Sequence, residues 1–266
     1  MTSNHWPSMR PTLIDYGRLL DGITLEGELL AQFAASAGPD LEVPGRPGIT
    51  VADTVLLTGT AYRRALAWIR HGEQPDEWQR PPVEGAGDVI AFHTDGRREL
   101  VAELSAHRPD EPCATWWPAH RTYGFWRRRM AHETAVHRVD VQAAAGVAPT
   151  PVDPDFAADG IDETLLLWFG HQMAERNVTA TESGAVGVEA AGRAWLAILS
   201  RARSSARRAP AVDARAADAL VTGDPMNVYL WLWGRVPDQA VDTTGDFEAS
   251  AQLWGLLRLA TPTTIV

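Results

Sequence analysis

The stretch FWRRRMAHETAVHRVD, residues 125–140, decides the fold class and contains the first candidate functional residues. Its uninterrupted mixture of apolar and charged residues, without glycine or proline, predicts a helix. At roughly 100° per residue, Glu133 and His137 lie about 40° apart on that helix, so their side chains can converge on one ion. His132 lies about 140° away from His137 on the same helix and is not expected to share the site.

Two further residues of this helix bear on the pair. Asp140 is seven residues after Glu133, on the same stripe, where a carboxylate can orient a ligand or a water molecule. Arg129 is four residues before Glu133 and can form an ion pair with it. The plain alternative is that Glu133 and His137 make an ordinary contact on a polar helix face.

Three more helices are predicted on the N-terminal side of this segment. Apolar residues recur at helical spacing over 13–36 and 85–107, and a further helix runs from residue 50 to about His71. Thr50 and Asp53 form a capping box at the start of that helix. A proline-rich loop is expected at 74–84, and the fourth helix ends near Gly146. Four helices with two sizeable connections indicate a bundle.

The C-terminal half has a different character. A fifth helix is predicted over 155–175, followed by a small α+β unit with strands near 186–199 and 211–222 and a helix around 226–235. The expected organisation is a helical bundle at 1–150, a connecting helix at 151–175 and a small α+β domain at 176–266.

Composition limits the functional classes. A net charge of −10 argues against non-specific nucleic-acid binding and favours a small-molecule partner. The arginine run 127–129 is interpreted as a solvated helix face. The N-terminus lacks a signal-peptide pattern and no apolar run reaches the roughly 20 residues of a membrane span, so a cytoplasmic protein is expected. Cys113 is the only cysteine, and oligomeric state stays open.

Three blocks of sequence resemble one known family. FWRRRMAHETAVHRVDVQAA is similar to the signature helix of the mycothiol-dependent maleylpyruvate isomerase family, and PGITVADTV is similar to the start of its second helix. NVYLWLWGRVPDQAVDTTGD resembles its C-terminal block, which ends in Trp233-Gly-Arg235 followed by Gly245-Asp246. The resemblance implies a mostly α protein, with a DinB-like four-helix bundle followed by a small α+β C-terminal domain.

The resemblance also implies a divalent metal, usually zinc, with Glu133 and His137 as two of its ligands. Zinc in an open three-ligand site activates a thiol or polarises a carbonyl. The family's third ligand is a histidine of the second helix, and here that position is occupied by Leu57, which cannot coordinate. Asp53 is a candidate replacement, although its capping role is favoured. The remaining candidates are His71, His93, His120 and His171.

Arg235 corresponds to the arginine of the family's WGR block and is expected to bind a carboxylate, unless it only bonds carbonyl groups at a helix end. With Glu133 and His137 it completes the predicted catalytic set. The candidates for cofactor binding are Arg129, Trp126 and Tyr62. Trp233 is a further pocket candidate, and for the aromatic residues a place in the core is the plain alternative.

Three functions remain open from the sequence. The first is mycothiol-dependent isomerisation or S-transfer on a small electrophilic substrate. The second, motivated by Leu57, is a metal-free descendant in which Glu133 and His137 perform acid/base chemistry on a small-molecule intermediate. The third is a non-catalytic protein that binds a small molecule. Cys113 is not expected to be a nucleophile, because the neighbouring Asp110 and Glu111 should raise its pKa.

Overall fold

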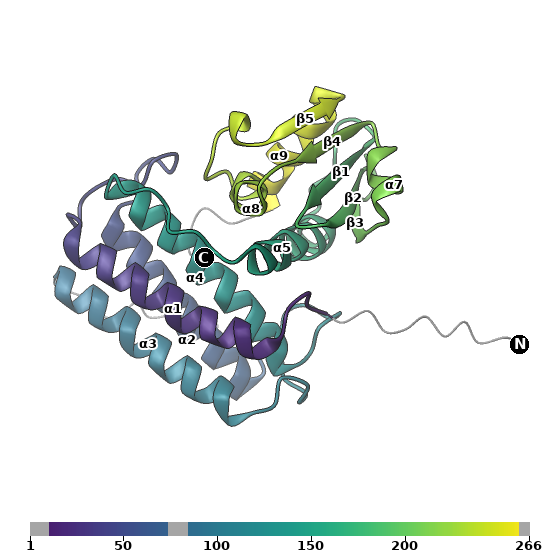
Figure 1. The fold of residues 1–266 in the computed structure, drawn as a ribbon. Helices are drawn as coiled ribbons and strands as arrows, with labels where there is room; N and C mark the ends of the chain where they lie inside the picture. Colours follow the sequence, from purple (N-terminus) through teal and green to yellow (C-terminus); the bar gives the residue numbers. More distant parts are fainter. Residues whose placement is uncertain (1–10, 74–84, 261–266) are drawn as a thin grey trace, which may run out of the picture.

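A computed structural model describes residues 11–73 and 85–260 of the chain. The four predicted N-terminal helices are present and pack side by side as a bundle (Figure 1). Their bounds are Tyr16–Ser36 for α1, Val51–His71 for α2, Ala86–Ala106 for α3 and Tyr123–Ala144 for α4. Helix α4 contacts the other three. The proline-rich loop predicted at 74–84 lies outside the described residues.

Helix α2 begins with the predicted capping box. The Thr50 hydroxyl accepts a hydrogen bond from the Asp53 amide at 3.1 Å, and the Asp53 carboxylate accepts one from the Thr50 amide at 3.1 Å. The pair satisfies two amides that would otherwise lack partners at a helix start. The helix ends at Gly72, whose φ of 83° is the left-handed conformation that glycine adopts without strain.

Helix α4 is buried along almost its whole length, including its charged residues. Arg127, Arg128 and Arg129 are 8%, 1% and 2% exposed. The interpretation of this run as a solvated face is therefore wrong. The reason is that the C-terminal part of the chain covers the side of α4 that the bundle leaves open, so that every face of the helix meets protein.

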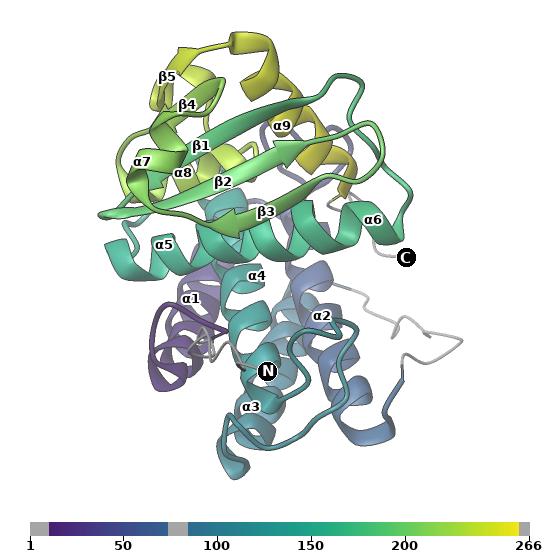
Figure 2. The ribbon, with the colours of Figure 1, turned by 90° about the vertical axis from the view of Figure 1, so that its right-hand side faces the viewer.

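One continuous helical segment lies between the bundle and the C-terminal sheet (Figure 2). It corresponds to the helix predicted at 155–175 and consists of α5 (Pro154–Glu163), the π-helix η1 (Thr164–Gln172) and α6 (Met173–Glu175). Asp153 caps its start by accepting a hydrogen bond from the Asp155 amide at 2.9 Å. Trp168 lies in the π-helical turns and its ring contacts those of Trp116 and Trp233.

A mixed sheet with strand order β3-β2-β1-β4-β5 forms the C-terminal layer. Strand β1 is parallel to β4, and the other neighbours are antiparallel. The single strand predicted near 186–199 is instead a hairpin of β1 (Gly184–Ala190) and β2 (Arg193–Leu199). The chain reverses at Ala191 and Gly192, whose φ angles of 51° and 68° are those of a two-residue hairpin turn.

The strand predicted at 211–222 also needs correction, because it begins as helix α7 (Ala211–Arg215) and only ends as β4 (Ala219–Thr222). Helix α7 lies so close to β1 that a Cβ on Gly187 would be 2.1 Å from the Ala214 carbonyl oxygen. The remaining elements are β3 (Ser205–Arg208), α8 (Pro225–Leu232), the 3-10 turn η2 (Asp238–Ala240), β5 (Asp242–Gly245) and α9 (Phe247–Ala260). Among the described helices, none is sufficiently long and apolar to cross a bilayer.

Candidate functional site

A pocket of about 180 Å³ lies where the bundle meets the C-terminal unit. Helix α4 contributes Glu133, Val136 and His137, so two of the predicted site residues lie on its wall. Gly45 and Gly234 also line it. The other lining side chains come from four separate segments of the chain: Arg46, Trp168, Trp233, Arg235, Trp254 and Arg258.

His137 is held between two carboxylates of its own helix. Its Nε2 atom lies 3.2 Å from Glu133 Oε1, and its Nδ1 atom lies 3.1 Å from Asp140 Oδ2. Burial by itself would lower the pKa of His137, but the hydrogen bonds with Asp140 and Glu133 outweigh it and raise the pKa above 6.5. The imidazolium form is therefore more stable here than in a free histidine, and Asp140 lies where its carboxylate can orient the ring.

Glu133 is also bound by a cation. Arg129 donates to Glu133 Oε2 at 2.6 Å and forms a second ion pair with the buried Glu163. Burial would raise the pKa of Glu133, but the charge of Arg129 and the bond with His137 hold it well below its usual value. Arg129 is 2% exposed and does not line the pocket, so its observed role is to fix the Glu133 carboxylate.

Asp140 joins three segments of the protein. Arg235, which follows α8, donates to both Asp140 oxygens at 2.8 and 3.0 Å. Arg46, from the connection between α1 and α2, donates to Oδ2 at 3.0 Å. Asp140 is 2% exposed, and burial by itself would raise its pKa. The charge of Arg235 and the hydrogen bond with His137 outweigh burial and hold the pKa low. Arg235 thus lies at the pocket, already paired with an acid.

Two predicted pocket residues lie elsewhere. The Tyr62 hydroxyl is inside the bundle, 2.8 Å from Thr134 Oγ1, and the Trp126 indole donates to the Ala114 carbonyl at 2.9 Å. Neither lines this pocket, so both are core residues, whereas Trp233 does line it. Among the arginine and tryptophan side chains that line the pocket, sequence reasoning missed Arg46, Trp168, Trp254 and Arg258. No local motif marks them, because they converge from segments far apart in the chain.

Within the described part of the chain, the other candidate histidines do not complete a metal site. His132 Nε2 is 2.9 Å from Asp159 Oδ2, on the side of α4 that its spacing indicated. His93 is buried beside Tyr62, His120 contacts Tyr16, and neither His71 nor His171 lines the pocket.

The donor set at the pocket does not fit the zinc ion that the resemblance implies. Within residues 11–73 and 85–260, no three histidine, cysteine or acidic side chains are arranged to hold an ion. Leu57 offers no donor atom. Glu133 and His137 are bonded to each other, and Arg129 adds a fixed positive charge to the carboxylate. A cation would have to displace these contacts with only two protein ligands.

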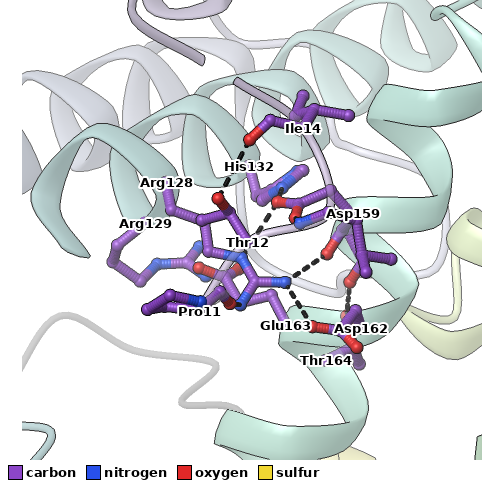
Figure 3. A network of polar contacts seen from close by, with 12 residues as sticks. Pro11, Thr12, Ile14, Arg128, Arg129, His132, Asp159, Asp162, Glu163 and Thr164 are labelled. Atoms are coloured by element: carbon purple, nitrogen blue, oxygen red, sulfur yellow. Dashed lines mark hydrogen bonds and ion pairs between the residues drawn. The ribbon is translucent and has the colours of Figure 1, made fainter. Parts of the chain in front are cut away.

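A buried ion network around Arg128 joins α4 to α5 (Figure 3). Arg128 of α4 donates to Asp159 at 2.9 Å and to Asp162 at 2.8 Å, both on α5. The sheet joins the network through Asp162, which accepts hydrogen bonds from Trp195 at 2.8 Å and from Arg208 at 2.7 Å. The network therefore ties α4 to α5 and α5 to the sheet.

Comparison with known proteins shows what the N-terminal bundle is similar to. Residues 25–142 match the model of the mycothiol maleylpyruvate isomerase N-terminal domain. Over these residues the N-terminal bundle is similar to this domain family. The resemblance found in the sequence is thereby confirmed, and the matched bundle contains Glu133, His137 and Asp140. The pocket residues of η1, of the segment after α8 and of α9 lie outside the matched range.

Solved structures extend the likeness to the C-terminal unit. A crystal structure of the mycothiol-dependent maleylpyruvate isomerase is matched with a TM-score of 0.55 and 13% identity, over 89% of this chain and 97% of that chain. A histidine-to-alanine mutant of that enzyme is matched with a TM-score of 0.57 and 12% identity over the same shares. These values show the isomerase fold, mostly α with a small mixed sheet. No curated protein is matched.

Proposed function

We propose that the protein is an enzyme that binds a small anionic molecule in this pocket and transfers a proton to it from His137. A metal ion held by Glu133 and His137 is not required for this reaction. The observation that supports the proposal is the position of His137 on the pocket wall, hydrogen-bonded to a carboxylate on each side. A histidine with a raised pKa is protonated over more of the neutral range and is suited to donate a proton.

The two carboxylates have different roles in this reaction. Asp140 accepts the Nδ1 proton of His137 and has a lowered pKa, so the neutral imidazole keeps that proton after the transfer. The proton that leaves is on Nε2, where only Glu133 competes for it. Because Arg129 keeps the Glu133 carboxylate ionised, Glu133 stabilises the imidazolium and does not take the proton.

The pocket favours a small ligand with a flat apolar part. Its volume of about 180 Å³ is below the roughly 300 Å³ at which pockets for drug-sized ligands begin. The indole rings of Trp168, Trp233 and Trp254 provide apolar walls. Three arginines at the same pocket make its field positive, which attracts an anion.

A second candidate is the mycothiol-dependent isomerisation or S-transfer that the family resemblance suggests. The arginines at the pocket favour it, because positive charge stabilises a thiolate. The thiol must still lose its proton, and Glu133, with its strongly lowered pKa, is a weak base for that step. The metal-free proton transfer from His137 therefore has the stronger support.

An assay of maleylpyruvate isomerisation, with and without mycothiol and with a strong chelator, separates these functions. Chelator-resistant turnover without thiol, lost in His137→Gln, supports the first candidate. Chelator-resistant turnover that requires mycothiol supports the second. Loss of turnover on chelation, restored by zinc, contradicts the metal-free chemistry and also the conclusion that the donor set does not fit zinc. The matched control is His107→Gln, a histidine 2.9 Å from Glu111 on the surface, and it should behave as wild type.

Histidine NMR tests the proton donor without a known substrate. In a ¹⁵N-labelled protein, His137 should titrate above 6.5, and its Nδ1 should stay protonated when Nε2 loses its proton. A His137 pKa at or below 6.5 would remove the proposed donor. Ligand binding that is unchanged in His137→Gln, with no turnover in wild type, would identify a binding protein instead.

A further inference from the structure

Arg258 enters the pocket from the last turns of α9. Its guanidinium carbon lies 4.8 Å from the centroid of the Trp254 ring, and Nη2 donates to the Leu232 carbonyl at the end of α8. The Nε and Nη1 atoms are buried, and within the described part of the chain they have no hydrogen-bond partner. Most of the donor capacity of this guanidinium is therefore unused.

The neighbouring cations differ from Arg258 in this respect. Arg235 and Arg46 form ion pairs with Asp140, and Arg129 pairs with Glu133 and Glu163. Among the residues that the structure describes, no acid pairs with Arg258. A buried charge without a partner costs stability, and such a cost is characteristic of residues that serve a ligand.

A purely structural role explains only part of this arrangement. The hydrogen bond to Leu232 satisfies a carbonyl at a helix end that would otherwise lack a partner. One N–H group is enough for this bond, so it does not account for the remaining N–H groups of Arg258. The whole guanidinium group nevertheless packs against the backbone at Gly234. Gly234 has a φ of 67°, and a Cβ at this position would be 2.1 Å from Arg258 Nη1. The positive φ favours glycine at residue 234, and a side chain there would displace the Arg258 guanidinium from its present position.

We propose that Arg258 is an anion-binding residue of this pocket, whose unused N–H groups bind a carboxylate or phosphate group of the ligand. This inference rests on the proposed function, because it names the anionic group of the small molecule that is proposed to bind in the pocket. Arg258 is distinct from Arg235, whose guanidinium is already bonded to Asp140 and to the Trp233 carbonyl.

The charge balance of the pocket agrees with an anionic ligand. Among the residues that the structure describes, the pocket wall carries Arg46, Arg235, Arg258 and, when protonated, His137 as cations, and Glu133 as its carboxylate. Asp140 is bonded to Arg46, Arg235 and His137 but does not line the pocket. Burial and then the charge of Arg235 lower the pKa of Arg258 to about 9. The group therefore stays protonated at neutral pH, and a bound anion would stabilise its charged form.

The test is calorimetric titration of the purified protein with acetate, malonate and inorganic phosphate at low ionic strength. Wild type should bind malonate or phosphate, and Arg258→Met should weaken that binding roughly tenfold or more, as expected for a lost charge-assisted hydrogen bond. Arg258→Lys should fall between the two. The control Arg201→Met removes an exposed arginine paired with Glu182 and should bind as wild type. The preferred probe distinguishes a carboxylate from a phosphate ligand.

The melting temperature separates the proposal from a structural role. Arg258→Met removes an unpaired buried charge and keeps most of the volume, so its melting temperature should equal or exceed that of wild type. A lower melting temperature with unchanged probe affinity would overturn the proposal, and so would a wild type that binds none of the three probes. A normal His137 pKa together with Arg258-dependent binding would instead overturn the proton donor and leave the anion site standing.

Discussion

Arg235 and Asp140 form a two-point ion pair between the C-terminal unit and helix α4. Arg235 Nε lies 2.8 Å from Asp140 Oδ1, and Nη2 lies 3.0 Å from Oδ2. The carboxylate is 2% exposed, and its Oδ2 is also 3.1 Å from His137 Nδ1. The charge that orients His137 is thus partly neutralised by a residue from the other part of the chain. The C-terminal unit therefore influences the proton affinity of a bundle residue.

Replacement of Arg235 by methionine should raise the pKa of His137 and destabilise the protein. The Asp140 charge is then less compensated and favours the imidazolium more strongly. The free energy of unfolding should fall by about 3 kcal/mol, because a buried carboxylate loses one of its two arginine partners. Histidine NMR and urea unfolding measure the two effects. An unchanged His137 pKa would show that the two sites are not coupled, and Arg235→Lys should have a smaller effect on both.

The stability contributed by His137 should depend on pH with a definite sign. The folded-state pKa lies above 6.5, so protonation favours the folded state. This contribution is fully present below about pH 6.5 and is lost as the pH rises through the folded pKa. The difference in unfolding free energy between wild type and His137→Gln should therefore shrink with rising pH. A difference that grows with pH would mean that His137 is held neutral, and His107→Gln serves as the control.

Cys113 should react slowly with thiol reagents in the folded protein. Burial is the main cause that raises the pKa of its thiol to about 11. A raised pKa was expected from the sequence, but there it was attributed to the neighbouring Asp110 and Glu111. At pH 8 the thiolate fraction is then about 100-fold below that of a thiol with a pKa of 9. The rate of reaction with Ellman's reagent measures this directly, because the chain has one cysteine. Rates that are equal in buffer and in urea would contradict the prediction.

Side-chain positions were predicted best where all the residues concerned belong to one helix. The spacing of Glu133, His137 and Asp140 predicted which side chains share a stripe of α4, and the separate position of His132, because a rigid helix converts sequence spacing directly into angle. The capping box of Thr50 and Asp53 was similarly local. These features depend only on residues within about two turns of one another.

Features that depend on distant segments were missed. Arg258 reaches the pocket only because α9 packs beside α8, and no spacing relates it to His137. The arginines of α4 were misread because burial depends on what covers a helix, which helical periodicity does not report. The hairpin turn at Ala191 was missed for another reason, since alanine seldom adopts the left-handed conformation that the turn requires.

The buried network around Arg128 should contribute much of the stability that joins the bundle to the C-terminal unit. Arg128→Met leaves Asp159 and Asp162, both 0% exposed, without their shared cation, and unfolding free energy should fall by about 4 kcal/mol. The control Arg207→Met breaks an exposed pair with Asp213 and should cost about 0.5 kcal/mol.

Acid unfolding gives a second measurement of the same network. Burial opposes ionisation of Asp159, but Arg128 and His132 lower its pKa to about 2, below the unfolded value near 3.8. The stabilisation is therefore present above about pH 3.8 and is lost as the pH falls toward 2. Arg128→Met should shift acid unfolding to higher pH, because without the cation Asp159 is protonated more easily. An acid transition unchanged from wild type would show that His132 alone keeps Asp159 ionised.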